Sequence, residues 1–358
     1  MIRGILALMV FGLSAIGTAQ LPASAPEIDA IKARVDHYSA TPVNLHNGVT
    51  ALPGLTYWEP VGYRRLTLDL YLPPSSVPRP SDGFPLVVYI HGGGWIQGNS
   101  HRLNPFVDFP GVLASLSARG YVVASIEYRL SSEAKFPAQA QDVKGAIRWL
   151  RINASKYGID PTRAVTWGVS AGGHLSGLAA VSCHVQAFAP EEAKSFVADT
   201  KPDPIVSSNV SDCVQGAVAW YGVFDMATIA EQAKQDKAMS RDVPDVPEWQ
   251  LLGCFGNQKC SPGQIAEASP VSFVNRVSSP MLLIVGTEDR TVPYHQTLEM
   301  AEKLKSVGVK HELIVLPGVR HGLIGTTPEQ TRDANLKALD ATFRFIDETI
   351  GNASRTNH

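Results

Sequence analysis

Two glycine-rich segments contain the residues of this chain that are best suited to chemistry. Residues 91–95 read His-Gly-Gly-Gly-Trp, residues 168–172 read Gly-Val-Ser-Ala-Gly, and each follows an apolar run. A Gly-x-Ser-x-Gly sequence forms a sharp strand-to-helix turn that exposes the hydroxyl of its serine, here Ser170. The glycine run supplies backbone N–H groups suited to an oxyanion, and losing one such donor raises a barrier by about 2.7–4 kcal/mol. Together the segments predict a serine nucleophile beside an oxyanion pocket.

A serine nucleophile needs a base to take its proton and a carboxylate to orient that base. The expected chain order is serine, then acid, then histidine. His321 follows the strand-like run 312–316 near the end of the sequence, and we predict that it is the base. Asp289 lies in a Gly-x-x-Asp-x-x-Val-Pro sequence after the run 281–285 and is the predicted acid; its neighbour Glu288 is the alternative.

Other residues near these segments have structural or substrate-binding interpretations. We expect His91 to brace the glycine loop through a side-chain hydrogen bond, and His174, one helical turn past the serine, to be a buried core residue with satisfied hydrogen bonds. Trp95 either fills the core or forms a wall of the acyl pocket. The aromatic candidates for substrate contact are Trp95, Tyr221, Phe224 and Tyr294.

The composition is that of a globular protein with a substantial core. Of 358 residues, 44% are hydrophobic and 18% are charged, and 31 basic against 33 acidic side chains leave a net charge of -2. A balance so close to neutral favours neither a nucleic acid nor an anionic membrane as partner. Nucleophilic attack by a serine needs no metal or organic cofactor, and the partner that we expect is a small-molecule ester substrate. The sequence leaves the oligomeric state open.

The first nineteen residues have the pattern of a cleaved secretory signal. A basic residue, Arg3, precedes the apolar run 5–16, and Gly-Thr-Ala at 17–19 provides an exit of small residues, with cleavage expected between Ala19 and Gln20. The alternative is a membrane anchor, but the run is shorter than the roughly 20 residues that cross a bilayer. We therefore expect a secreted or periplasmic protein.

The chain has four cysteines, which in an exported protein favour disulfides. Four cysteines permit three pairings. Cys254 and Cys260 are close enough to close a short loop, and Cys183 and Cys213 bracket a long segment rich in Pro, Ser and Ala. Four buried thiols are the alternative, and no zinc-binding spacing is present.

After a lead-in over residues 20–56, strand-like and helix-like segments alternate through a catalytic domain expected at 57–350. The predicted strands are 65–71, 86–90, 122–127, 164–167, 216–220, 281–285 and 312–316, and the predicted helices are 139–157, 297–307 and 333–350. Such alternation predicts an α/β fold, with a mostly parallel sheet covered by helices on both faces. Two inserts, 184–212 and 225–270, interrupt it. The second is either a lid over the site or a surface excursion without a role.

The motif set resembles that of the α/β-hydrolase superfamily, over about residues 57–350. Within it, the chain is similar to esterases that carry His-Gly-Gly-Gly-Trp, and in particular to the feruloyl esterase-like (BD-FAE-like) branch. This resemblance rests also on Tyr128-Arg-Leu, on the sequence of residues 157–161 (Tyr-Gly-Ile-Asp-Pro), and on the six residues that begin at Ser170. Val169 departs from the hormone-sensitive-lipase-like pattern, in which an acidic residue is usual at this position.

The resemblance implies specific roles. In similar esterases the oxyanion donors are backbone N–H groups that correspond to those of Gly93, Gly94 and Ala171, and the catalytic triad corresponds to Ser170, Asp289 and His321. The expected function is hydrolysis of short-chain or aromatic acyl esters through an acyl-enzyme, with feruloyl or acetyl esters of plant-wall material and polyester fragments as candidate substrates. The alternatives are an arylformamidase- or peptidase-like amide hydrolase and a non-catalytic binding protein with a hydrolase fold.

Overall fold

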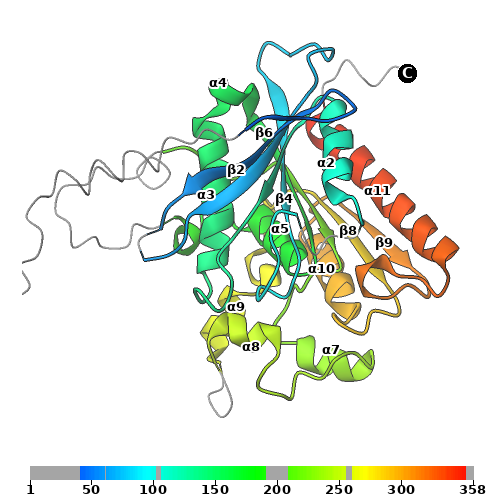
Figure 1. The fold of residues 1–358 in the computed structure, drawn as a ribbon. Helices are drawn as coiled ribbons and strands as arrows, with labels where there is room; N and C mark the ends of the chain where they lie inside the picture. The colour runs from blue at the N-terminus through cyan, green and yellow to red at the C-terminus, as the bar shows by residue number, and fades with distance from the viewer. Residues whose placement is uncertain (1–40, 61, 102–105, 191–208, 255–259, 352–358) are drawn as a thin grey trace, which may run out of the picture. The chain divides into compact units, whose positions relative to one another are not determined.

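A single sheet, nine-stranded over the described residues, forms the framework of the protein (Figure 1). The computed structural model describes residues 41–60, 62–101, 106–190, 209–254 and 260–351, so the predicted signal segment 1–19 lies outside it. The strands are β1 (Val43–Asn44), β2 (Thr50–Trp58), β3 (Leu66–Leu72), β4 (Phe84–Ile90), β5 (Val122–Ile126), β6 (Ile159–Val169), β7 (Gly216–Trp220), β8 (Met281–Gly286) and β9 (His311–Leu316). Their order across the sheet is β1-β2-β3-β5-β4-β6-β7-β8-β9.

Most of the sheet is parallel, as the alternating pattern predicts. Strands β5, β4, β6, β7, β8 and β9 run parallel to one another, whereas β1, β2 and β3 form an antiparallel edge, in which β3 pairs antiparallel with β5. In β4 every residue is buried, with Leu86, Val88 and Ile90 packed on one face and Val87 and Tyr89 on the other. A strand buried on both faces must be apolar throughout, which explains why these strands appear in the sequence as continuous apolar runs.

Helices cover both faces of the sheet, again as predicted. On one side, α3 (Ala138–Ile152), α5 (Ala171–Val181) and α10 (His295–Ser306) share a hydrophobic core with the sheet. On the other side lie α2 (Phe109–Ala118) and α11 (Pro328–Ile350), which belong to a second core (Figure 1). The sheet is therefore the middle of three layers. The loops that follow the parallel strands meet where the carboxyl ends of these strands lie side by side.

The boundaries of several elements differ from the prediction. The shorter helices and 3-10 turns are α4 (Ala154–Tyr157), α7 (Ile229–Gln235), α8 (Pro247–Leu252), α9 (Pro262–Glu267), η1 (Gln186–Phe188), η2 (Pro270–Phe273) and η3 (His321–Leu323). The predicted helix 139–157 divides into α3 and α4. Helix α11 begins five residues before the expected position 333, because Thr327 caps it by accepting a hydrogen bond from the Gln330 N–H, and Pro328 occupies its first position.

The predicted start of the catalytic domain at residue 57 is wrong. Strands β1 and β2 lie within the supposed lead-in and pair with the sheet, and one compact unit extends from residue 40 onward. The prediction missed β2 because Pro53 and Gly54 interrupt its apolar pattern. These two residues fall at a register shift between Leu52 and Leu55, where a bulge accommodates them, and the Gly54 N–H donates to Asp69.

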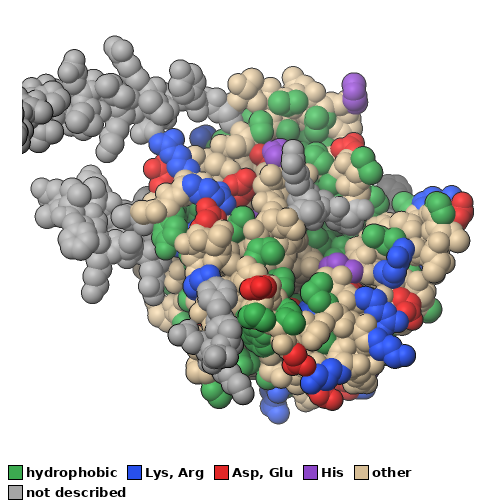
Figure 2. Space-filling view, turned by 60° about the horizontal axis from the view of Figure 1, so that its bottom comes forward, with side chains coloured by type: hydrophobic (Ala, Val, Ile, Leu, Met, Phe, Trp, Pro, Cys, Tyr) green, Lys and Arg blue, Asp and Glu red, His purple; other side chains and the backbone are tan. Residues whose placement is uncertain are grey.

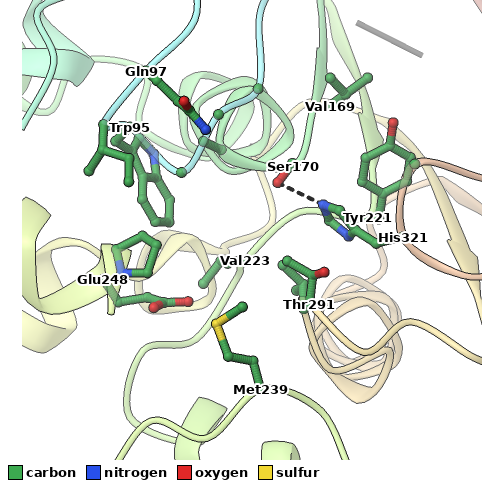
Figure 3. A pocket seen from close by; sticks show the side chains of 18 of the residues that line it. Trp95, Gln97, Val169, Ser170, Tyr221, Val223, Met239, Glu248, Thr291 and His321 are labelled. Carbon is green, nitrogen blue, oxygen red and sulfur yellow. Dashed lines mark hydrogen bonds between the residues drawn. The ribbon is translucent and has the colours of Figure 1, made fainter. Parts of the chain in front are cut away.

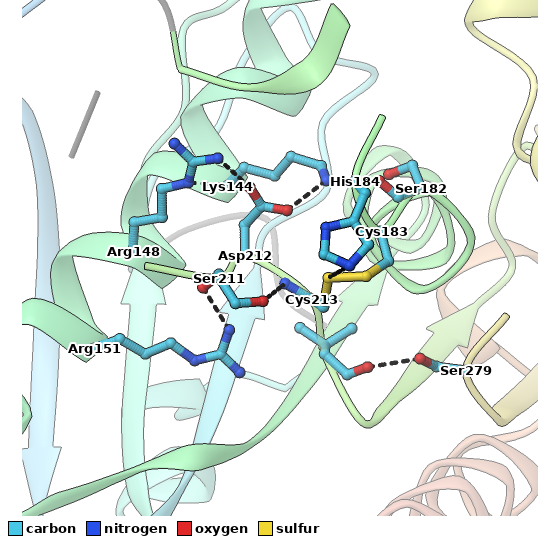
Figure 4. The surroundings of a disulfide bond; sticks show 11 residues. Lys144, Arg148, Arg151, Ser182, Cys183, His184, Ser211, Asp212, Cys213 and Ser279 are labelled. Carbon is cyan, nitrogen blue, oxygen red and sulfur yellow. Dashed lines mark hydrogen bonds and ion pairs between the residues drawn. A yellow bond between two sulfur atoms is a disulfide. The ribbon is translucent and has the colours of Figure 1, made fainter. Parts of the chain in front are cut away.

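Two disulfides are present, and they join the pairs that the spacing suggested. Cys183 is bonded to Cys213 and Cys254 to Cys260. Next to the first disulfide, the carboxylate of Asp212 lies 2.8 Å from Lys144 Nζ and 2.7 Å from Arg148 Nη2, both on α3 (Figure 4). The disulfide and these ion pairs hold the two ends of the insert 184–212, of which residues 191–208 lie outside the described part.

Charge is distributed without a dominant sign on the face that Figure 2 shows. Basic and acidic side chains are interspersed there among apolar and uncharged ones. The arrangement agrees with the net charge of -2 for the chain. Among the described residues, no helix combines the length and the apolar character that a bilayer crossing requires.

Candidate active site

Ser170 lies at a sharp turn between β6 and α5. Its φ is 54° and its ψ is -119°, a conformation that costs energy for a residue with a side chain. The turn is possible only because its neighbours are glycines: a Cβ on Gly168 would overlap the carbonyl of Gly172, and a Cβ on Gly172 would overlap the carbonyl of Ile90. The Gly-x-Ser-x-Gly sequence thus forces the strained turn that presents the Ser170 hydroxyl.

The three residues predicted as a triad form one line of hydrogen bonds. Ser170 Oγ lies 3.1 Å from His321 Nε2, and His321 Nδ1 lies 2.7 Å from Asp289 Oδ2 (Figure 3 shows the first contact). Because a carboxylate can only accept, Nδ1 carries the proton and Nε2 is left to accept the serine proton. The fallback acid Glu288 is not part of this line, since its side chain is 48% exposed and pairs with Arg290.

The loop after β8 holds the Asp289 carboxylate in place. The second oxygen, Oδ1, accepts hydrogen bonds of 2.9 Å from the N–H groups of both Thr291 and Val292. The side chain is fully buried, whereas that of His321 is 23% exposed. The carboxylate is therefore fixed on one side by backbone donors and directs its other oxygen to the imidazole.

The backbone N–H groups predicted as oxyanion donors belong to residues that line the same cavity as Ser170. Gly93 and Gly94 have positive φ values of 106° and 61°, which explains why glycine occupies these positions. Ala171 is the first residue of α5, where an N–H group has no partner within its helix. Over the described part of the chain, none of these three N–H groups donates to a protein acceptor. They remain available to a ligand.

A cavity of about 470 Å³ opens beside the Ser170 hydroxyl (Figure 3). Two of the four aromatic residues predicted for substrate contact, Trp95 and Tyr221, line it. The other two do not line this cavity. Phe224 is fully buried in the core against Gly177 of α5, and Tyr294 lies at the start of α10 beside the ring of His295.

The sequence of this chain matches two families of known proteins. Residues 68–304 match the model of the BD-FAE family. The chain belongs to the BD-FAE family. Residues 261–350 also match the model of the dienelactone hydrolase family.

Relatives of the chain include named esterases, and solved structures share its fold. Esterase LipC of Mycobacterium tuberculosis is 30% identical over 247 residues, which are 68% of this chain and 54% of LipC, so the chain spans about half the length of the curated relatives it matches. A truncated carbohydrate esterase from gut microbiota is 25% identical, with a TM-score of 0.65, over 86% of this chain and 99% of that one. The thermophilic esterase Est2 of Thermogutta terrifontis is 24% identical, with a TM-score of 0.63, over 90% and 96%. The protein has the α/β-hydrolase fold.

His91 supports the glycine loop 92–94 of this BD-FAE protein, as predicted. Its Nδ1 donates to the Gly92 carbonyl at 2.7 Å, and its ring stacks on that of Tyr128 with 4.3 Å between centroids. The Tyr128 hydroxyl in turn donates to the His91 carbonyl. Burial lowers the pKa of His91 to about 4, so the ring is neutral and acts through packing and hydrogen bonding.

His174 is a buried core residue with both ring nitrogens satisfied, also as predicted. Its Nε2 donates to the Ala268 carbonyl at 2.8 Å, which leaves Nδ1 to accept from Trp95 Nε1 at 3.2 Å. Burial lowers the pKa of His174 to about 4. Trp95 is thus both core filler and cavity wall, since it is 1% exposed and still lines the cavity.

The insert 225–270 supplies part of the cavity wall, which the sequence did not assign to particular residues. Met239, Arg241, Pro247 and Glu248 line the cavity. Arg241 and Glu248 form an ion pair of 2.8 Å, in which each side chain is only 2% exposed. No periodic pattern marks these residues. The signal in the sequence that could have pointed to them was two residues of opposite charge, Arg241 and Glu248, on either side of Pro247, which begins α8.

Proposed function

We propose that this chain is a serine carboxylic ester hydrolase that works through an acyl-enzyme. The observation that carries the proposal is the hydrogen-bonded line from Ser170 through His321 to Asp289, beside N–H groups that have no protein acceptor in the described structure. Family membership supports it, because relatives such as LipC are named esterases. Ester hydrolysis through a serine acyl-enzyme uses this arrangement of nucleophile, base and oxyanion donors.

The mechanism follows from the proton positions. His321 Nε2 takes the hydroxyl proton as Ser170 Oγ attacks the ester carbonyl carbon, and the carbonyl oxygen, now negative, accepts hydrogen bonds from the N–H groups of Gly93, Gly94 and Ala171. The imidazolium is stabilised by Asp289 and gives its proton to the departing alcohol oxygen as the C–O bond breaks. Water then loses a proton to His321 and attacks the acyl carbon. The acid leaves, and Ser170 Oγ recovers its proton.

Short-chain or aromatic acyl esters are the substrates that we propose for this site. The rings of Trp95 and Tyr221 give the cavity flat walls suited to an aromatic acyl group such as feruloyl. A structural neighbour is named a carbohydrate esterase, which supports feruloyl or acetyl esters of plant-wall material as candidates. Polyester fragments are a further candidate. No metal or organic cofactor takes part in the proposed steps.

Export is part of the proposal. Disulfides persist in oxidising compartments and are rare in the cytosol of most organisms. The pairs Cys183–Cys213 and Cys254–Cys260 therefore support a secreted or periplasmic location. The signal-like pattern of residues 1–19 points in the same direction.

Labelling and burst kinetics test the proposed function together. The purified protein should react with a fluorophosphonate at Ser170 and should release a burst of 4-nitrophenol from 4-nitrophenyl acetate or butyrate. Ser170→Ala should abolish both, while Ser115→Ala, which alters an exposed serine of α2, should change neither.

Each alternative function has its own outcome. Turnover of a matched anilide faster than the ester would indicate the amide hydrolase. A folded protein that neither takes the label nor turns over any ester would indicate the non-catalytic binding protein. Unchanged turnover in Ser170→Ala would refute the assignment of the nucleophile.

A further inference from the structure

A buried ion pair in the wall of the cavity has unused hydrogen-bonding capacity. Arg241 and Glu248 come from the insert 225–270, and both line the cavity that contains the Ser170 hydroxyl. Their contact joins Arg241 Nη2 to Glu248 Oε1 at 2.8 Å, and each side chain is 2% exposed. Burying two charges is costly unless their remaining hydrogen-bonding positions are also filled.

The hydrogen bonds of the arginine fix its position. Arg241 Nη1 donates to the Met239 carbonyl, and Nη2 donates also to the Thr291 carbonyl at 2.8 Å. Thr291 follows Asp289 by two residues, and its own N–H donates to the Asp289 carboxylate. The insert is therefore connected by Arg241 to the loop that holds the predicted catalytic acid.

The carboxylate of Glu248 is only half satisfied. Oxygen Oε1 accepts from Arg241, whereas Oε2 is buried and has no hydrogen-bond partner in the part of the chain that the structure describes. Figure 3 shows this carboxylate at the wall of the cavity, near the side chains of Met239 and Val223. An acceptor left unpaired in such a place is unfavourable in the empty site and becomes satisfied when a ligand supplies a donor.

The charge of the pair determines which donor fits. Arg241 already compensates the charge of Glu248, so a cationic group would be left without a full counter-charge, while a neutral hydroxyl would gain a charge-assisted hydrogen bond. We propose that Glu248, held in position by Arg241, accepts a hydrogen bond from a free hydroxyl of the substrate. The substrate class is thus an ester that carries a hydroxyl in its acyl or its alcohol part. This inference rests on the proposed function.

Two matched pairs of esters test the inference on the purified enzyme. The acyl pair is methyl 3-(4-hydroxyphenyl)propanoate and methyl 3-phenylpropanoate, whose saturated linker isolates the carbonyl from the ring. The alcohol pair is 3-hydroxypropyl acetate and propyl acetate. For one pair, the hydroxylated ester should have a kcat/KM about 10- to 100-fold higher than its partner, and the pair that responds identifies the part of the substrate that carries the hydroxyl.

Variants then assign the preference to Glu248. Glu248→Gln retains an acceptor without the charge, and the ratio of the two kcat/KM values should fall severalfold. Because a lone Arg241 would be a buried unpaired charge, the pair is removed together as Arg241→Met with Glu248→Leu, which keeps the volume, and the ratio should fall to about one. Asp242→Asn breaks an exposed ion pair with Lys234 in the same insert and should leave the ratio unchanged.

The outcomes separate this inference from the proposed function. Arg241 Nε is also buried without a hydrogen-bond partner among the described residues. If the ion pair serves only to hold the insert, or if Nε closes a second contact with Glu248 Oε2, then removing the pair should lower kcat/KM for both esters of a substrate pair by the same factor. Wild-type ratios within twofold of one for both pairs, or a ratio that survives in the double variant, would overturn the role of Glu248 while ester hydrolysis stands. A wild-type protein that neither takes the fluorophosphonate label nor hydrolyses any ester would instead refute the proposed function, whereas one that turns over 4-nitrophenyl acetate but none of these four esters would overturn only the role of Glu248.

Discussion

His321 Nδ1 and Asp289 Oδ2 lie 2.7 Å apart, and the other oxygen of the same carboxylate accepts two backbone N–H groups. The aspartate thus acts as a fixed acceptor that sets the tautomer of the histidine. Asp289→Asn places an amide where the acceptor stood, so the Nε2 of His321 no longer faces Ser170 as a base. We expect kcat for 4-nitrophenyl butyrate to fall by about 10⁴-fold.

Glu288→Gln is the matched control for this prediction. Glu288 is the neighbouring carboxylate, but it is half exposed and pairs with Arg290. We expect kcat to stay within about twofold of the wild-type value, since exposed ion pairs contribute little. A larger loss in Glu288→Gln than in Asp289→Asn would show that the acid is assigned to the wrong residue.

Gly172→Ala should prevent the serine turn from forming. The added Cβ would overlap the carbonyl of Ile90, which is backbone and cannot move away cheaply. We expect little soluble folded protein, or a folded protein with no fluorophosphonate labelling. Gly263→Ala is the control, because in α9 a Cβ would meet only the Ser261 side chain at 3.9 Å. Circular dichroism and labelling of both variants decide the matter, and normal labelling of Gly172→Ala would contradict the steric argument.

Acid should destabilise the fold through its buried histidines. Burial lowers the pKa of His91 and His174 to about 4, whereas an unfolded histidine titrates near 6.5. Between these values the unfolded chain binds more protons, so the free energy of unfolding is fully retained above about pH 6.5 and decreases as the pH falls toward 4. Each histidine contributes about 3 kcal/mol to this decrease. Urea unfolding at pH 7.5, 5.5 and 4.5 measures it.

A glutamine variant identifies the contribution of one of these histidines. The amide of His174→Gln can donate to the Ala268 carbonyl and accept from Trp95, and it does not titrate. Its free energy of unfolding should therefore depend less steeply on pH than that of the wild type. His46→Gln, at an exposed position, should keep the wild-type dependence. Parallel pH profiles for His174→Gln and the wild type would rule out the imidazole as the source.

The two disulfides should differ in their contribution to stability. The Cys183–Cys213 bond spans 30 residues and Cys254–Cys260 spans 6. Loop-closure entropy then predicts a loss of about 3.6 kcal/mol when the first is removed by paired alanine substitutions, and about 2.2 kcal/mol for the second. Free energies of unfolding in urea test the order, and a greater loss at the short loop would contradict it.

The local turn at the nucleophile could be predicted from the sequence because short-range sterics determine it. The glycines at 168 and 172 define the turn at Ser170 without reference to the rest of the chain. The acid and the histidine follow the strands β8 and β9, and the loops after parallel strands meet at one edge of a sheet. Their chain order and strand context were therefore enough to predict Asp289 and His321.

The residues of the cavity wall could not be predicted from the sequence, because long-range contacts determine which of them face the cavity. Tyr221 follows β7 directly and lines the cavity at a φ of 40°, whereas Phe224, three residues later, packs into the core. Both are aromatic residues of one short segment, and nothing in their type separates them.

What the sequence alone determined was which residues form the candidate site, since the turn, the glycine loop, and the carboxylate and histidine that follow β8 and β9 are each encoded by a few consecutive residues. What only the tertiary structure decided was the cavity wall opposite these residues. Arg241 and Glu248 reach it through contacts with each other and with Thr291, which is 50 residues from Arg241 along the chain. Such contacts follow from how the insert packs on the sheet edge, and no local pattern of residues specifies that packing.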